Sequence, residues 1–170
     1  MSKYIGISEN KLKHSIGVAR KCYQIAKNEG FDEIFCRKMF MNGWCHDVGY
    51  EFSETHSEHP DVSAEMFSCM INDDTVSYVD ADHKEVSDTP HKTYNAIKEH
   101  GIYTENKTDE WRILNMADMQ INHKGKEVDV VTRLNGIKNR YGEHSEQYLT
   151  ACDICYQIGL TEINLSINTP

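Results

Sequence analysis

Histidine and aspartate residues recur along this chain at positions that could share a metal ion. The adjacent pair His46-Asp47 lies in residues 44 to 50 (WCHDVGY), and His14 and Asp118 lie on either side of it in the sequence. Neutral imidazoles and carboxylates together are suitable ligands for a divalent transition metal. A bound dication lowers the pKa of its water toward neutrality and polarises a phosphoryl or carbonyl oxygen. The set therefore indicates metal-assisted hydrolysis, although any one of its histidines, taken alone, is more often a packing or surface residue.

Helices must position these residues, because helical periodicity is widespread and strand signals are almost absent. Over about residues 8 to 29, apolar residues repeat at intervals of four and three, which predicts a first helix carrying His14. A second helix runs into the His46-Asp47 pair, and we expect Gly49 to end it. Ligands from different helices would then meet around one ion, as in other helical bundles with metal sites.

Six further helices are predicted along the rest of the chain. They are a helix from His59-Pro60, a short helix from Asp73-Asp74 to His83, helices at about 91–100 and from 108 to Asp118, and two at about 127–141 and 143–158. We therefore predict an all-α fold, with a single domain over residues 1 to 170. Its metal-site core covers about residues 8 to 122, and the C-terminal helices, about 127 to 158, pack on that core.

The composition is that of an ordinary soluble domain, with 39% hydrophobic and 26% charged residues among 170. The formal net charge of −9 argues against general binding to nucleic acid or to an anionic membrane, because both need a surplus of Lys and Arg. A small anionic substrate is compatible with the negative net charge, because a bound dication and a few lysines can dominate the electrostatic potential at short range. No apolar run has the length of a membrane span, and the N-terminus lacks the apolar core of a signal peptide.

The six cysteines lie in predicted helices rather than in loops. Without secretion signals, this placement predicts reduced thiols in a cytoplasmic protein. Cys152 and Cys155 form a C-x-x-C motif, but they lie late in the chain without a βαβ context, and we interpret them as packing residues.

Three short motifs resemble those of the HD-domain phosphohydrolase superfamily over roughly residues 8 to 122. They are His14-Ser15-x-x-Val18-Ala19, His46-Asp47-Val48-Gly49 and Ala117-Asp118. The resemblance implies a helical bundle whose metal is held by a first histidine, the HD pair and a distant aspartate. Transferred to this sequence, those ligands are His14, His46, Asp47 and Asp118.

Members of the superfamily that bind a second metal add two histidines between the HD pair and the last aspartate. His59, which begins a predicted helix, resembles the first of these. His83 follows an acidic turn and a short helix, and resembles the second. His100 is the alternative, because its distance from Asp118 is similar to that in the small diadenosine tetraphosphate hydrolases. We favour His83 as the second histidine. With His59 and His83 both as ligands, Asp47 would bridge two metals. Asp47, His59 and His83 would then be the catalytic residues.

The ligand set suits one or two ions of iron, manganese, cobalt, nickel or zinc better than magnesium alone. For the substrate we expect contacts from Lys84 and His100, because Lys84 directly follows His83. Lys11 and Lys13, beside His14, could also meet a phosphate as point charges. For each of these lysines the alternative is a solvated helix face.

The resemblance implies a metal-dependent phosphohydrolase that cleaves a phosphomonoester or phosphodiester, with a nucleotide as the expected substrate. The expected partner is thus a small-molecule phosphate ester rather than nucleic acid or a membrane, and the oligomeric state is open between monomer and homodimer. One alternative is a di-iron oxygenase of the same fold, chemistry that some relatives perform. Another is a metal- or nucleotide-binding regulator without turnover, although all four ligands of a single-metal site are present.

Overall fold

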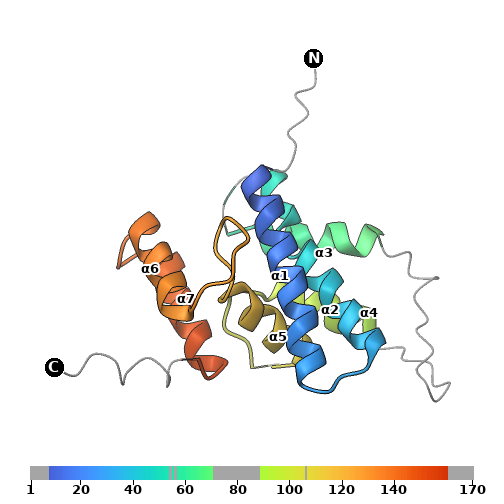
Figure 1. Ribbon diagram of the computed structural model, residues 1–170. Coiled ribbons are helices and arrows are strands. Elements are labelled where there is room, and N and C mark those ends of the chain that lie inside the picture. The colour runs from blue at the N-terminus through green and yellow to red at the C-terminus, as the bar shows by residue number, and fades with distance from the viewer. Residues whose placement is uncertain (1–7, 54, 56, 71–88, 106, 161–170) are drawn as a thin grey trace.

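The computed structural model describes residues 8–53, 55, 57–70, 89–105 and 107–160 (Figure 1). Over these residues the chain forms seven α-helices and one short 3-10 helix, η1, and the only strand-like feature is a single bridge between Ile121 and Glu127. The helices are α1 (Glu9–Asn28), α2 (Glu33–Cys45), η1 (Val48–Glu51), α3 (His59–Met70), α4 (Thr89–Lys98), α5 (Asp109–Asp118), α6 (Val130–Tyr141) and α7 (Glu146–Gln157). The prediction of an all-α fold is confirmed.

Side-chain caps explain where most of these helices begin. The oxygen of each capping side chain accepts a hydrogen bond from a backbone N–H of the first turn, which would otherwise lack a partner. The caps are Ser8, Asp32, Thr108, Asp129 and Ser145, for α1, α2, α5, α6 and α7. Because these signals are local, the predicted start of α5 at residue 108 agrees closely with the structure.

The second helix ends earlier than the sequence predicted. α2 ends at Cys45, and Gly49 lies inside η1 rather than at a helix end. A Cβ atom at Gly49 would lie 2.3 Å from the backbone oxygen of His59 and 2.5 Å from the nitrogen of Ser63. The prediction that Gly49 ends the helix was therefore wrong: glycine allows η1 to pack against α3, where the Gly49 N–H donates to Ser63 Oγ at 2.8 Å.

Helices α1 and α2 lie in close contact at Gly43. A Cβ atom there would lie 2.6 Å from the Cα of Ala19, so the two backbones are in contact. Around this pair lies a continuous apolar core. Its largest fully buried side chains include Met39, Ile97, Trp111, Ile113 and Leu114. This core holds the ends of α1, α2, α4 and α5 in fixed positions.

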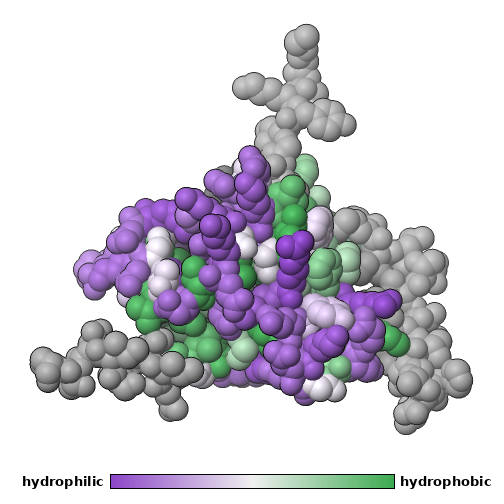
Figure 2. Space-filling model, viewed as in Figure 1, coloured by the Kyte–Doolittle hydropathy of each residue, from purple (hydrophilic) through white to green (hydrophobic). Residues whose placement is uncertain are grey.

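Helices α6 and α7 form a hairpin beside the bundle of α1 to α5 (Figure 1). Ile137, Ala151, Ile154 and Cys155 of this hairpin are buried and belong to the same hydrophobic cluster as the bundle core. Hydrophilic residues cover most of the face shown in Figure 2, whereas hydrophobic ones gather in the region of the hairpin. In the part of the chain that the structure describes, no helix is both long and apolar enough to cross a membrane.

A buried ion pair joins α2 to α5. Lys38 Nζ donates to Glu110 Oε1, and both side chains are more than nine-tenths buried. Burial lowers the pKa of Lys38 despite the hydrogen bond to Glu110. We expect Glu110→Ala to reduce the free energy of unfolding by about 3–5 kcal/mol, because it leaves a buried charge without its partner. Urea denaturation would measure this loss.

Replacement of both partners tests the same explanation. Lys38→Met combined with Glu110→Leu is expected to recover most of the lost stability, since no buried charge then remains. Glu33→Ala, which breaks an exposed pair with Arg37, serves as the control and should have little effect. A double variant as unstable as Glu110→Ala would contradict the electrostatic explanation.

Candidate metal centre

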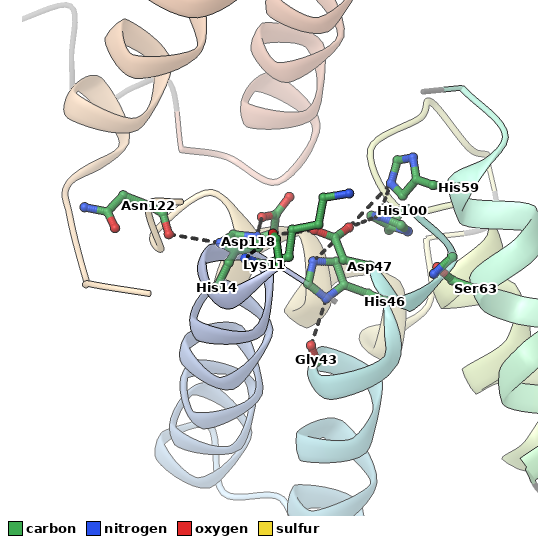
Figure 3. A network of polar contacts seen from close by, with 12 residues as sticks. Lys11, His14, Gly43, His46, Asp47, His59, Ser63, His100, Asp118 and Asn122 are labelled. Carbon is green, nitrogen blue, oxygen red and sulfur yellow. Dashed lines mark hydrogen bonds and ion pairs between the residues drawn. The ribbon is translucent and has the colours of Figure 1, made fainter. Parts of the chain in front are cut away.

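Six side chains converge where the ends of several helices meet (Figure 3). His14 comes from α1, His46 and Asp47 directly follow α2, His59 begins α3, His100 follows α4, and Asp118 ends α5. The close contact of α1 and α2 at Gly43 brings the rings of His14 and His46 to a centroid distance of 5.5 Å. The converging positions are thus set by the helix packing described above.

Asp47 lies at the centre of this cluster. Its Oδ1 atom is 3.4 Å from the Nε2 atoms of His46, His59 and His100. Its other oxygen, Oδ2, is 3.8 Å from His14 Nε2. One carboxylate therefore faces all four imidazoles of the cluster, two on α1 and α2 and two on the side of α3 and α4.

Three of the imidazoles are oriented by backbone carbonyl groups. The Nδ1 atoms of His14, His46 and His100 bond to the oxygens of Asn122, Gly43 and Ile97, at 3.0, 2.8 and 2.5 Å. A carbonyl only accepts, so Nδ1 carries the proton, and in the neutral ring Nε2 keeps the lone pair. All three Nε2 atoms point into the cluster (Figure 3). Metal-binding histidines in proteins commonly have this arrangement.

His46 gives the clearest sign of a ligand. Its side chain is fully buried, and within the described residues Nε2 makes no hydrogen bond. A buried polar atom without a partner is costly, and a bound cation is one way to satisfy it. Burial lowers the pKa of His46 to about 4, so the ring is neutral and able to bind a metal at neutral pH.

The other imidazoles and carboxylates of the cluster shift one another's pKa values. Burial works against protonation of His14 and His100, yet their hydrogen bonds to Asp118 and Asp47 outweigh it and raise both pKa values. Burial also works against ionisation of Asp47, but the neighbouring histidines hold its pKa well below the usual range. A positive charge is therefore favoured between these carboxylates and imidazoles, whether protons or a metal ion supply it.

Two groups of ligand atoms are close enough to hold an ion. The atoms of His14, His46 and Asp118 lie within 4.8 Å of one another, and so do those of His46, Asp47 and His100. The Nε2 atoms of His59 and His100 are also 3.2 Å apart. These buried histidine and aspartate groups could hold a metal ion, as the sequence predicted.

The structure brings together five of the six predicted ligands, together with His100. His83, which we favoured as the sixth, lies outside the described residues, as does Lys84. His100 was expected at the substrate or as the alternative ligand, and it lies within the cluster beside Asp47 and His59. Among the residues that the structure describes, His100 is therefore the histidine that pairs with His59.

Of the two lysines beside His14, only Lys11 lines the pocket above the cluster. Its Nζ lies 3.9 Å from the centroid of the Tyr50 ring and 3.8 Å from Glu51. Lys13 is exposed and pairs with Glu9. Of these two lysines, Lys11 is therefore the one that could contact a phosphate in the pocket.

The pocket has a volume of about 640 Å³ and its floor includes His14, Asp47, His59, His100 and Asp118. Its opposite wall is the α6–α7 hairpin, which contributes the residues that sequence analysis missed. They include Arg133, Ile137, Arg140, Tyr141, Ala151 and Ile154. Arg133, Ile137 and Arg140 are spaced four and three apart, so they share one face of α6, but no sequence signal relates that face to His46-Asp47.

Comparison of the chain with protein-family models, with curated proteins and with solved structures found no match.

Proposed function

We propose that this protein is a metal-dependent phosphohydrolase of the HD-domain type. The observation that carries the proposal is the shared orientation of the histidines around Asp47. His14, His46 and His100 each bond through Nδ1 to a carbonyl, and each directs Nε2 toward a carboxylate. A set of ligands held in place in this way is what a resident metal requires.

The ligands are numerous enough for two ions, with Asp47 available to both. His14, His46 and Asp118 would hold a first ion together with Asp47, and His59 and His100 a second one. Nitrogen and oxygen donors in this ratio favour iron, manganese, cobalt, nickel or zinc. Such ions supply an acidified water as nucleophile and positive charge for the oxygens of a phosphoryl group.

The charges around the pocket support an anionic substrate. Lys11, Arg133 and Arg140 line the pocket together with three carboxylates, those of Asp47, Asp118 and Glu146. Metal binding would neutralise two of the carboxylates, leaving a surplus of positive charge in a protein of net charge −9. A local cationic site of this kind attracts and orients a phosphate ester.

The apolar wall supports an organic group on that phosphate. Ile137, Ala151 and Ile154 are buried and line the side of the pocket formed by the hairpin. The volume of about 640 Å³ is typical of small-molecule sites and large enough for a nucleoside. We therefore propose a nucleotide-sized phosphomonoester or phosphodiester as the substrate.

A panel of nucleotide phosphomonoesters and phosphodiesters tests this function. Protein reconstituted with manganese, cobalt, nickel or iron is expected to release phosphate or nucleotide from at least one of them, and the same protein treated with a chelator should not. Equal hydrolysis by the chelated protein would contradict the proposal. Oxygen uptake by the iron-loaded protein, without hydrolysis of any ester, would favour the oxygenase alternative instead.

A further inference from the structure

Arg133 reaches the metal centre from the wall opposite the histidines. Its Nη2 atom donates to Asp118 Oδ1 at 3.1 Å, and its side chain is 12% exposed. The Nε–H group is buried and makes no hydrogen bond within the described chain. A guanidinium has five N–H donors in one plane, so most of the hydrogen-bonding capacity of Arg133 is not used by Asp118.

A purely structural role explains this position poorly. Asp118 is a candidate metal ligand, and a guanidinium beside it repels any cation that the carboxylate binds. Arginine would therefore weaken the metal centre that the other residues build. The repulsion is offset if an anion lies between the arginine and the cation, as a phosphoryl group would.

We propose that Arg133 binds the phosphoryl oxygens of the substrate through the N–H groups that Asp118 does not use. This inference rests on the proposed function. Arginine suits the role because its planar fork can donate two parallel hydrogen bonds to one phosphate. This role gives α6 a phosphate-binding residue, which approaches the metal centre from across the pocket.

The position of Arg133 also orients the substrate. Ile137, one turn along α6, is buried and lines the pocket, as does Ala151 of α7. Arg140 follows after one more turn and also lines the pocket. A phosphate held by Arg133 therefore directs its organic group along the apolar face of the hairpin, toward Arg140.

Two titrations by calorimetry test the proposal: Mn²⁺ into the protein, and inorganic phosphate into the Mn²⁺-loaded protein. For Arg133→Gln we expect phosphate affinity to fall by about 10- to 100-fold, because charge-assisted hydrogen bonds are lost. Its Mn²⁺ affinity should stay equal or rise, since a repelling charge is removed. Arg133→Lys keeps the charge without the fork, and its phosphate affinity should be intermediate.

Lys138→Gln is the matched control. This lysine is also on α6, pairs with Glu143 at 3.0 Å and does not line the pocket, so both affinities should stay within about twofold of the original protein. If Arg133→Gln does not fold, as judged by circular dichroism, Arg133→Lys provides the comparison instead.

The outcomes distinguish this inference from the function on which it rests. Unchanged phosphate affinity in Arg133→Gln overturns the inference, and so does a parallel fall of Mn²⁺ and phosphate affinity, which would mean that Arg133 only supports Asp118. If the unaltered protein binds Mn²⁺ but no phosphate, the inference is also overturned. The proposal of a metal centre would not be affected by that result. Protein that binds no transition metal at all contradicts the proposed function itself.

Discussion

Asp47→Ala is expected to lower hydrolytic activity on the order of 1,000-fold and to remove most of the tight metal binding. Among the residues that the structure describes, Asp47 is the carboxylate that faces all four imidazoles, at 3.4 Å from three of them and 3.8 Å from the fourth. Its loss would therefore weaken both proposed metal positions together. A reduction of this size corresponds to about 4 kcal/mol of transition-state stabilisation. Activity assays on the preferred ester and metal analysis after dialysis would measure the two effects.

Asp61→Ala is the matched control for this variant. Asp61 lies in the first turn of α3, has an exposed side chain and pairs with Lys98 at 3.5 Å. Its replacement removes the same charge from the protein without touching the cluster, so activity and metal content should be unchanged. Full activity in Asp47→Ala, or an equal loss in Asp61→Ala, would contradict the central role of Asp47.

The helices could be predicted from the sequence because their signals are local. Capping residues such as Asp32 and Thr108 bond to N–H groups only three residues away, so a short stretch of sequence is enough to find them. The end of α2 could not be found in the same way. It depends on the contact of Gly49 with α3, which is a packing interaction between separate elements.

The metal cluster was predictable in part, for a similar reason. His14, His46, Asp47 and Asp118 could be selected by their order and spacing, and the structure brings them together. The choice between His83 and His100 depends on where the end of α4 packs, which no spacing rule fixes. Arg133 was missed because its relation to Asp118 arises only when the hairpin folds back over the cluster.

The cluster also explains why its residues are hard to interpret one at a time. His46 alone is a buried histidine, and its carbonyl partner could belong to an ordinary helix end. Three rings share one hydrogen-bond pattern and are directed at two carboxylates. One common cause explains this repetition more simply than three independent causes. The repeated orientation, rather than any single residue, therefore indicates that the cluster could hold a metal ion.

His100→Gln is expected to reduce the metal content from two ions per protein to one and to lower activity by about 100-fold. His100 is 5% exposed, and its Nε2 lies 3.4 Å from Asp47 Oδ1 and 3.2 Å from His59 Nε2, so we assign it to the proposed second position. The first ion should remain, held by the histidines of α1 and α2. A loss of about 100-fold is expected because one ion of a two-metal site no longer stabilises the charge of the reacting group.

His83→Gln is the decisive comparison for this prediction, because His83 was the ligand that sequence analysis favoured. If His100 holds the second ion, His83→Gln should keep two ions and full activity. Elemental analysis and anomalous scattering from crystals of both variants would count the ions directly. Loss of an ion in His83→Gln, with two ions retained in His100→Gln, would exchange the two assignments. A single ion in the unaltered protein would instead limit the centre to the position formed by His14, His46, Asp47 and Asp118.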